Sequence, residues 1–176
     1  MKPISIVRIC QPHEVCELIA LSNAIIEWLS LHGKQDYFEK VDVREAMQDP
    51  SKVFISRDEK GKIQGFLLLQ KPSGEEEGTY KKEFPSLRDG EALIVNTYGV
   101  APEKQGKKVG SNLLRAAYDY AIENGYTQFI GTIHPKNGAS ENMLRHVSHN
   151  LVKGKAFTHH TNDGRDLLRQ RFLQEL

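Results

Sequence analysis

The sequence predicts a mixed α/β fold in a single domain that spans residues 1–176. A length of 176 residues matches one domain of typical size. Segments whose side chains alternate between apolar and polar are interspersed with segments whose apolar residues recur every three or four positions. The predicted order of elements is β-α-α-β-β-β-α-β-α-β-β, and two neighbouring strands close the chain.

The N-terminal elements follow from periodicity and from residues that stop helices. Residues 4–10 alternate apolar and polar side chains, which predicts the first strand. Apolar residues within 15–29 form one helical stripe, and Gly33 is a typical helix end. Two capping-box-like patterns within 36–48 predict a second, shorter helix that ends before Pro50.

The middle of the chain contains a hairpin followed by a loop. Residues 52–57 and 63–70 flank a short polar turn in which Gly61 supplies a positive φ, as expected for paired antiparallel strands. Residues 71–90 are rich in glycine, proline and glutamate. We expect a long, solvent-exposed loop there, either a variable insertion or a functional segment.

The C-terminal half alternates strands and helices. Residues 92–100 are rich in Ile, Val, Thr and Tyr, which favour a strand. Apolar residues from Val109 to Ala121 share one helical face, and Asn124-Gly125 ends that helix. The remaining prediction is a strand at 127–133, a helix after Pro135, and a hairpin formed by 151–159 and 165–172.

Composition excludes several classes of protein. Lys and Arg number 24 against 23 Asp and Glu, whereas a dedicated nucleic-acid binder has a strongly basic domain. The longest fully apolar stretch, Phe66–Leu69, is far shorter than the roughly 20 residues that span a bilayer. The N-terminus shows no signal peptide. We therefore expect a cytoplasmic protein with no nucleic-acid or membrane partner.

The cysteines and histidines predict neither a disulfide framework nor a metal site. Cys10 and Cys16 are the only two cysteines, which is typical of a reducing compartment. The seven histidines include pairs at 146 and 149 and at 159 and 160, but no Cys or carboxylate cluster completes a set of four ligands. No metal is expected.

The segment from Val100 to Ser111 carries the clearest chemical signal. A predicted strand ends, a turn rich in glycine and lysine follows, and a long helix begins. The first amides of a helix lack partners and attract anions, and Lys104, Lys107 and Lys108 add positive charge. The segment matches neither the P-loop pattern nor the dinucleotide-binding pattern.

The run Gln105-Gly106-Lys107-Lys108-Val109-Gly110 resembles the acetyl-CoA-binding motif of the GNAT-type N-acetyltransferases, [Q/R]-x-x-G-x-[G/A]. Val100 stands five residues before Gln105, the usual spacing in that family, and Pro135-x-Asn137-x-x-Ser140 is similar to the family's segment between the fifth strand and the helix that follows it. The order of elements also matches. Lys108 departs from the motif, because relatives have glycine there. The resemblance implies a GNAT-like fold with one sheet and helices on both sides.

The resemblance also implies acetyl-CoA as cosubstrate and a set of contacts to it. The turn would bind the pyrophosphate through its backbone amides, and the preceding strand would pair with the pantetheine arm. Asn137 and Ser140 match positions on the pantetheine side, although both residues also cap helices well. The implied cofactor-binding residues are Tyr98, Gly99, Val100, Gln105, Gly106, Lys107, Lys108, Val109, Gly110, Ser111, Asn137 and Ser140.

Two catalytic groups that relatives use are missing. Many relatives have a tyrosine acid seven residues after the asparagine, where this chain has Leu144, and some have a glutamate base where it has Thr132. His134 shares a face with Thr132 if the strand continues, which makes it a candidate base. Tyr98 is a candidate acid, and Asn96, Glu91 and a chain of waters remain alternatives.

The resulting functional prediction is direct transfer of an acetyl group from acetyl-CoA to a primary amine. The alternatives are a catalytically impaired CoA-binding or regulatory module, and an enzyme that uses a different acyl-CoA. The acceptor, which is a small molecule or a protein, and the oligomeric state are not predicted by any pattern in the sequence.

Overall fold

A single sheet organises the protein in the computed structural model, which describes residues 6–38, 52–148, 150–161 and 164–176. The strand order is β1-β2-β3-β4-β5-β7-β6, and every neighbouring pair is antiparallel except β4 and β5. The strands are β1 (Ile6–Ile9), β2 (Lys52–Arg57), β3 (Ile63–Gln70), β4 (Ala92–Val100), β5 (Gln128–Ile133), β6 (Leu151–His160) and β7 (Asp166–Glu175).

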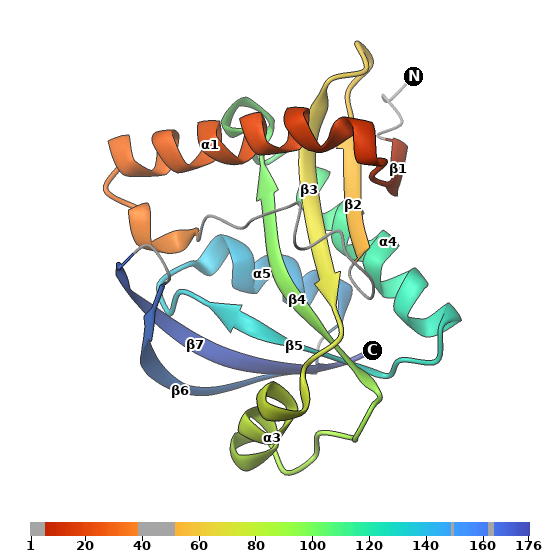
Figure 1. Ribbon diagram of the computed structural model, residues 1–176, viewed down its shortest axis with the longest axis vertical. Coiled ribbons are helices and arrows are strands. Elements are labelled where there is room, and N and C mark those ends of the chain that lie inside the picture. The colour runs from red at the N-terminus through yellow and green to blue at the C-terminus, as the bar shows by residue number, and fades with distance from the viewer. Residues whose placement is uncertain (1–5, 39–51, 149, 162–163) are drawn as a thin grey trace.

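Helices cover both faces of this sheet. α1 packs on β3 and β4 from one side, while α4 packs on β2, β3 and β4 from the other and contacts α5 (Figure 1). This arrangement confirms the mixed α/β fold with helices on both sides of one sheet. The helices are α1 (Val15–Leu31), α3 (Gly74–Glu83), α4 (Val109–Glu123) and α5 (Gly138–Val147), with 3-10 turns at Pro12–Glu14, Gln35–Tyr37 and Pro102–Lys104.

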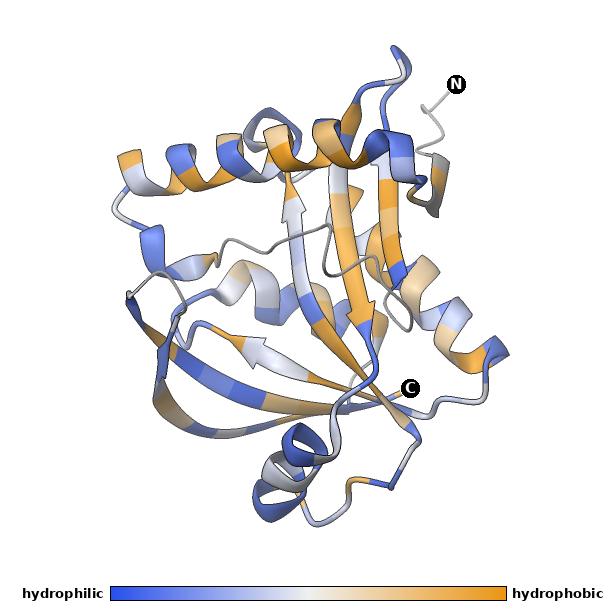
Figure 2. Cartoon of the chain, viewed as in Figure 1, coloured by the Kyte–Doolittle hydropathy of each residue, from blue (hydrophilic) through white to orange (hydrophobic). Residues whose placement is uncertain are grey.

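The alternation of side chains along the central strands divides the core into two layers. Leu67 and Leu69 pack with α4 and α5, whereas Phe66 and Leu68 pack with α1. Every residue of β3 from Ile63 to Leu69 is buried. A strand covered on both faces is expected to be apolar along most of its length, and Figure 2 shows this for β3.

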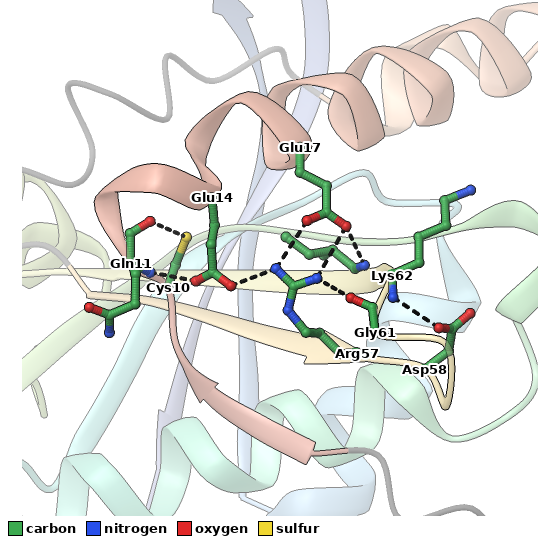
Figure 3. A network of polar contacts seen from close by, with 9 residues as sticks. Cys10, Gln11, Glu14, Glu17, Arg57, Asp58, Gly61 and Lys62 are labelled. Carbon is green, nitrogen blue, oxygen red and sulfur yellow. Dashed lines mark hydrogen bonds and ion pairs between the residues drawn. The ribbon is translucent and has the colours of Figure 1, made fainter.

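A cluster of charged side chains attaches the start of α1 to the hairpin of β2 and β3 (Figure 3). The guanidinium of Arg57 donates to Glu14 at 2.5 Å and to Glu17 at 3.0 Å, and it also donates to the carbonyl of Gly61. Glu17 accepts the backbone N–H of Ile63 at 2.7 Å. The bond to the buried Glu14 raises the pKa of Arg57 above its ordinary value, so this cation stays charged.

The prediction of a long loop at 71–90 is wrong, because α3 lies within that segment. Ser73 Oγ accepts the N–H of Glu76 at 3.2 Å, and the Glu76 carboxylate accepts the N–H of Ser73 at 2.8 Å. This reciprocal capping box starts the helix. Tyr80 and Phe84 are buried beneath it, in a cluster with residues of β4, β5 and β7.

The other elements agree closely with their predicted ranges. β2, β3 and β4 have the predicted boundaries, and α4 ends before Asn124-Gly125 as expected. β6 and β7 extend somewhat beyond the predicted 151–159 and 165–172. Of the helix predicted at 36–48, residues 36 and 37 belong to a 3-10 turn, Phe38 is extended, and the rest lies outside the described residues.

The two parallel strands diverge in the middle of the sheet. β4 pairs with β5 from Ala92 opposite Gln128 to Val95 opposite Gly131, and no further pairs follow. Beyond this point β4 stays with β3 while β5 stays with β7, so the sheet opens into a V (Figure 1). The split leaves the backbone of 96–100 without a strand partner on the side of β5.

Candidate functional site

A cavity of about 610 Å³ lies at the split between β4 and β5. Its walls come from β4 beyond Val95, from the turn and first residues of α4, and from the end of β5 and the start of α5. The C-terminal half of α1 and the segment 34–38 form the remaining wall. Segments that are far apart in the chain therefore meet at one opening in the sheet.

One end of the cavity is formed by the turn before α4. Gly106 has a φ of +74°, and Lys108 caps the helix in the left-handed conformation with a φ of +65°. Asn112 donates its N–H to the carbonyl of Lys108 at 3.0 Å. The amides that precede Asn112 in the first turn therefore remain available to a bound anion.

The three lysines of this turn differ in their surroundings. Lys108 lines the cavity, whereas Lys107 is exposed and does not line it. Lys104 lines the cavity and forms an ion pair with Asp58 across 3.3 Å. Backbone N–H bonds from the hairpin, led by that of Lys62, together with this ion pair hold the pKa of Asp58 below its ordinary value.

The floor of the cavity is β4 beyond the split. The hydroxyl of Tyr98 is buried and makes no hydrogen bond within the described part of the chain. Burial raises the pKa of this phenol to about 12, and the nearby Ser140 side chain opposes the shift slightly. At neutral pH Tyr98 therefore carries a proton that it is able to donate.

Gly99 is a point of close approach between β4 and α1. A Cβ atom at this position would lie 2.6 Å from Cδ1 of Ile25, 3.0 Å from the ring of Phe66 and 3.2 Å from the ring of Phe38. A larger residue at this position would therefore require the side chains of Ile25, Phe66 and Phe38 to shift. Glycine is favoured here by packing rather than by a turn.

His134 follows β5 and lies on the opposite wall. The residue is 8% exposed, and its ring packs on the ring of Tyr37, with 4.6 Å between the centroids. Its Nδ1 accepts the backbone N–H of Lys136 at 3.1 Å. Burial, and secondly the positive charge of Arg169, lower the pKa of His134 below its ordinary value, which favours the neutral ring.

The beginning of α5 completes the wall beside Tyr98. Asn137 Oδ1 accepts the N–H of Ser140 at 3.2 Å, which makes Asn137 the N-cap of the helix. Both residues line the cavity, so capping does not remove them from it. Leu144, one turn further along, is fully buried in the core.

The structure brings nearly all of the sequence-predicted site residues to this cavity. His134 and every implied cofactor-binding residue except Lys107 line it. The alternative Asn96 also lines it, whereas Glu91 lies at the other end of β4 and accepts a hydrogen bond from Thr127. The cavity is also lined by residues that no motif in the sequence specified, namely Ile25, Trp28, Leu29, Lys34, Tyr37, Phe38, Lys136 and Arg169.

A family model described as the acetyltransferase (GNAT) family matches residues 18–147. The chain belongs to the GNAT family. The matched segment runs from α1 to the end of α5 and includes both sides of the split. A comparison with curated protein sequences finds no match.

Solved structures share the same fold at low sequence identity. A GNAT-family acetyltransferase from Streptococcus pneumoniae is 15% identical, with a TM-score of 0.67 over 97% of this chain and 99% of that one. A ribosomal-protein-alanine N-acetyltransferase from Brucella melitensis is 18% identical, with a TM-score of 0.66 over 97% and 99%.

A third solved structure was determined with ligands. It is a spermidine N-acetyltransferase from Vibrio cholerae in complex with CoA and spermine, 14% identical, with a TM-score of 0.65 over 97% of this chain and 94% of that one. At such identities the similarity establishes the fold, and the acceptor has to be argued from this chain's own residues.

The described residues contain no group of three or more His, Cys, Asp or Glu side chains arranged to hold a metal ion. Within the same residues, none of the helices combines the length and apolarity needed to cross a bilayer.

Proposed function

We propose that this GNAT protein is an acetyl-CoA-dependent N-acetyltransferase that transfers the acetyl group directly to a primary amine. The observation that carries the proposal is the cavity at the split between β4 and β5, which opens at one end onto the amides that start α4. A long cosubstrate with an anionic end and a neutral arm matches this shape and charge.

The residues present fit such a cosubstrate. The amides of Val109, Gly110 and Ser111 and the ammonium of Lys108 would hold the pyrophosphate. The backbone of 97–100, which has no strand partner on the side of β5, would form hydrogen bonds with the amides of the pantetheine arm, as it would with a neighbouring strand. The buried, unpartnered hydroxyl of Tyr98 points to a ligand, because buried polar groups in proteins are rarely left without a partner.

Bound acetyl-CoA would supply the acetyl group as a thioester. Attack by the neutral amine forms the new C–N bond and breaks the C–S bond. The attacking nitrogen then loses one proton to solvent, and the leaving thiolate gains one. Tyr98 is the donor we assign, because its phenol stays protonated at neutral pH. In this role it replaces the tyrosine that relatives have at the position of Leu144.

His134 is better suited to donating a hydrogen bond than to acting as the base. Its Nδ1 accepts the N–H of Lys136, so a neutral ring carries its proton on Nε2. A nitrogen that carries a proton is unable to take another from the amine. We therefore assign His134 to binding and orientation of the acceptor.

Calorimetric titration of acetyl-CoA tests the proposal. Ser111→Asp places a negative charge in the cavity at the start of α4, where the helix dipole tolerates it, so the fold should survive. Asn112→Asp adds the same charge at the adjacent exposed residue, which does not line the cavity. We expect Ser111→Asp to weaken binding about tenfold or more, and Asn112→Asp to weaken it much less.

Two results would contradict the proposal. One is equal binding of ATP and acetyl-CoA, since ATP shares the phosphates but lacks the pantetheine arm. The other is an affinity that Ser111→Asp leaves unchanged, because the phosphates would then lie elsewhere. Release of free CoA thiol in the presence of amines would complete the test.

A further inference from the structure

The end of the cavity furthest from the α4 turn has a distinct composition. We call it the acceptor end, and it is formed by Trp28, Lys34, Tyr37, His134, Lys136 and Arg169. These residues come from α1, the segment after it, the loop after β5, and β7. Three of them carry a fixed positive charge. Among the described residues that line the cavity there is no Asp or Glu.

Arg169 is the innermost of these cations, with 5% of its surface exposed. Its Nη1 donates to the backbone carbonyl of Asp36 and, at 3.4 Å, to that of Leu168. These carbonyls fix the orientation of the guanidinium. The hydrogen bonds to Asp36 and Leu168 therefore hold the Arg169 side chain in place in the cavity wall.

Lys34 and Lys136 lie at the rim of the acceptor end and are exposed. Neither ammonium has an ion-pair partner among the described residues. The carbonyl of Lys136 accepts the hydroxyl of Tyr37 at 3.2 Å, which joins the two sides of the rim. Their charges are thus available to a molecule that enters the cavity.

The charges of these groups change the pKa of His134. After burial, the charge of Arg169 is the largest influence that lowers its pKa, and Lys136 acts in the same direction. Asp36 opposes them, but its side chain does not line the cavity. A field that disfavours a protonated imidazole also disfavours an ammonium and favours an anion at the same place.

We propose that the acceptor is a small primary amine that also carries a carboxylate, as an α-amino acid does. The inference rests on the proposed function, since it names the substrate class of the same cavity. The carboxylate would face Lys136 and Lys34, and the rings of Trp28 and Tyr37 would flank the rest of the molecule. Polyamines, which carry several positive charges and no negative one, would be repelled.

The same field would assist the reaction. An amine attacks only after it has lost its proton, and nearby positive charge lowers the pKa of an ammonium. A cationic acceptor end therefore raises the fraction of neutral amine at a given pH. This contribution is useful in a site where the family's glutamate is replaced by Thr132 and where His134 is not placed to act as a base.

The test compares acceptors with and without the carboxylate, and each kcat/KM is referred to the concentration of neutral amine because the ammonium groups of acid and amide differ in pKa. The standard α-amino acids are each assayed beside the corresponding α-amide, with spermidine as the polyamine, by release of CoA thiol at fixed acetyl-CoA. We expect the best acid to exceed its amide in kcat/KM by about tenfold or more, and spermidine to be the poorest acceptor. Equal or better use of the amides or of spermidine would overturn the inference and leave the proposed function intact.

Variants of the rim lysines test the assignment of the contacts. Lys136→Gln and Lys34→Gln should raise KM for the acid several-fold while changing kcat little, because the carboxylate lies away from the reacting atoms. They should leave KM for the amide unchanged. Lys155→Gln is the matched control, since Lys155 is exposed and does not line the cavity. Equal effects on acid and amide would contradict the assignment.

Binding of products distinguishes failure of the inference from failure of the proposed function. N-acetyl amino acids and their amides are titrated into the CoA-loaded protein by calorimetry. The carboxylate proposal is overturned if the protein binds acetyl-CoA but binds no N-acetyl amino acid more tightly than the corresponding amide. This holds even if no amine is turned over. Protein that does not bind acetyl-CoA at all contradicts the proposed function instead.

Discussion

The Nζ atom of Lys104 lies 3.3 Å from Oδ2 of Asp58, so the turn before α4 is tied to the tip of the β2–β3 hairpin. The sequence suggested that Lys104 would contribute its charge to an anion. In the structure the ammonium of Lys104 is already paired with the carboxylate of Asp58. Lys108 also belongs to this turn and lines the cavity, and it has no ion-pair partner among the described residues.

The pairing of Asp58 predicts how stability depends on pH. Its pKa is lowered from an ordinary value of 3.8, chiefly by the backbone N–H of Lys62 and also by Lys104. A carboxyl whose pKa is depressed by folding stabilises the protein above its unfolded pKa, and this stabilisation is lost as the pH falls below about 4. Asp58→Asn should therefore make urea unfolding depend less steeply on pH between 5 and 3.

The exposed neighbour Glu59 provides the control for this measurement. It makes no hydrogen bond or ion pair within the described residues. Glu59→Gln should leave the pH dependence unchanged. Glu91 and Glu141 also have lowered pKa values, through Thr127 and Lys153 respectively, so part of the acid sensitivity should remain in both variants.

Lys108→Gly should stabilise the fold and weaken cofactor binding at the same time. A left-handed conformation costs a non-glycine residue about 1–2 kcal/mol, part of which is offset by the greater flexibility of glycine in the unfolded chain. We expect a net gain of about 0.5–1 kcal/mol in the free energy of unfolding. Acetyl-CoA affinity should fall because the cavity loses an ammonium.

Lys107→Gly separates these two effects from a general loss of charge. Lys107 is adjacent and exposed, but its φ is not positive and it does not line the cavity. Lys107→Gly should therefore not raise the free energy of unfolding. If Lys107→Gly and Lys108→Gly were to change stability and calorimetric affinity alike, the special role of position 108 would be excluded.

Tyr98→Phe should separate activity from stability. The hydroxyl is buried without a hydrogen bond, so its removal leaves no unpaired partner and should keep or raise stability by up to about 1 kcal/mol. If Tyr98 protonates the thiolate, kcat should fall about 100-fold. Thermal unfolding and steady-state kinetics measure the two quantities. An unchanged kcat would remove Tyr98 from the mechanism.

Gly131→Ala should destabilise the protein at the last residue pair before the split. A Cβ there would lie 2.8 Å from the carbonyl oxygen of Val95 and 2.8 Å from the ring of Phe172. Crowding against backbone should cost about 2–3 kcal/mol in the free energy of unfolding. Gly138→Ala, where no atom lies within 4 Å, should cost little. Similar losses from both would show that the contacts at Gly131 are not responsible.

The sequence was most informative where local chemistry determines structure. The β2–β3 hairpin follows from its alternating side chains and its glycine turn, and the start of α4 follows from its glycines and helical stripe. The sequence analysis did not predict α3, because the glycine, proline and glutamate content of 71–90 favoured a loop more strongly than the local helix signals favoured a helix. Its capping box, Ser73 with Glu76, and the spacing of Tyr80 and Phe84 were both present.

The candidate site divides in the same way. The end of the cavity at the α4 turn was predictable from the sequence because one continuous segment forms it. The acceptor end is formed by separate segments, because Trp28, Tyr37 and Arg169 are brought beside the sequence-predicted His134 only by the packing of α1 and β7 around the split. Sequence spacing carries no signal for such contacts.

The contacts of Gly99 have a consequence for any attempt to change which acceptors the cavity admits. With 2.6–3.2 Å between a virtual Cβ and the three nearest side chains, a larger residue here displaces Ile25, Phe66 and Phe38 from their packed positions. Atoms added on the strand side of the cavity therefore disturb the packing of the core. The helix side, where the partly exposed Trp28 lies, has room to vary. Diversification for new acceptors should begin on α1 and leave β4 untouched.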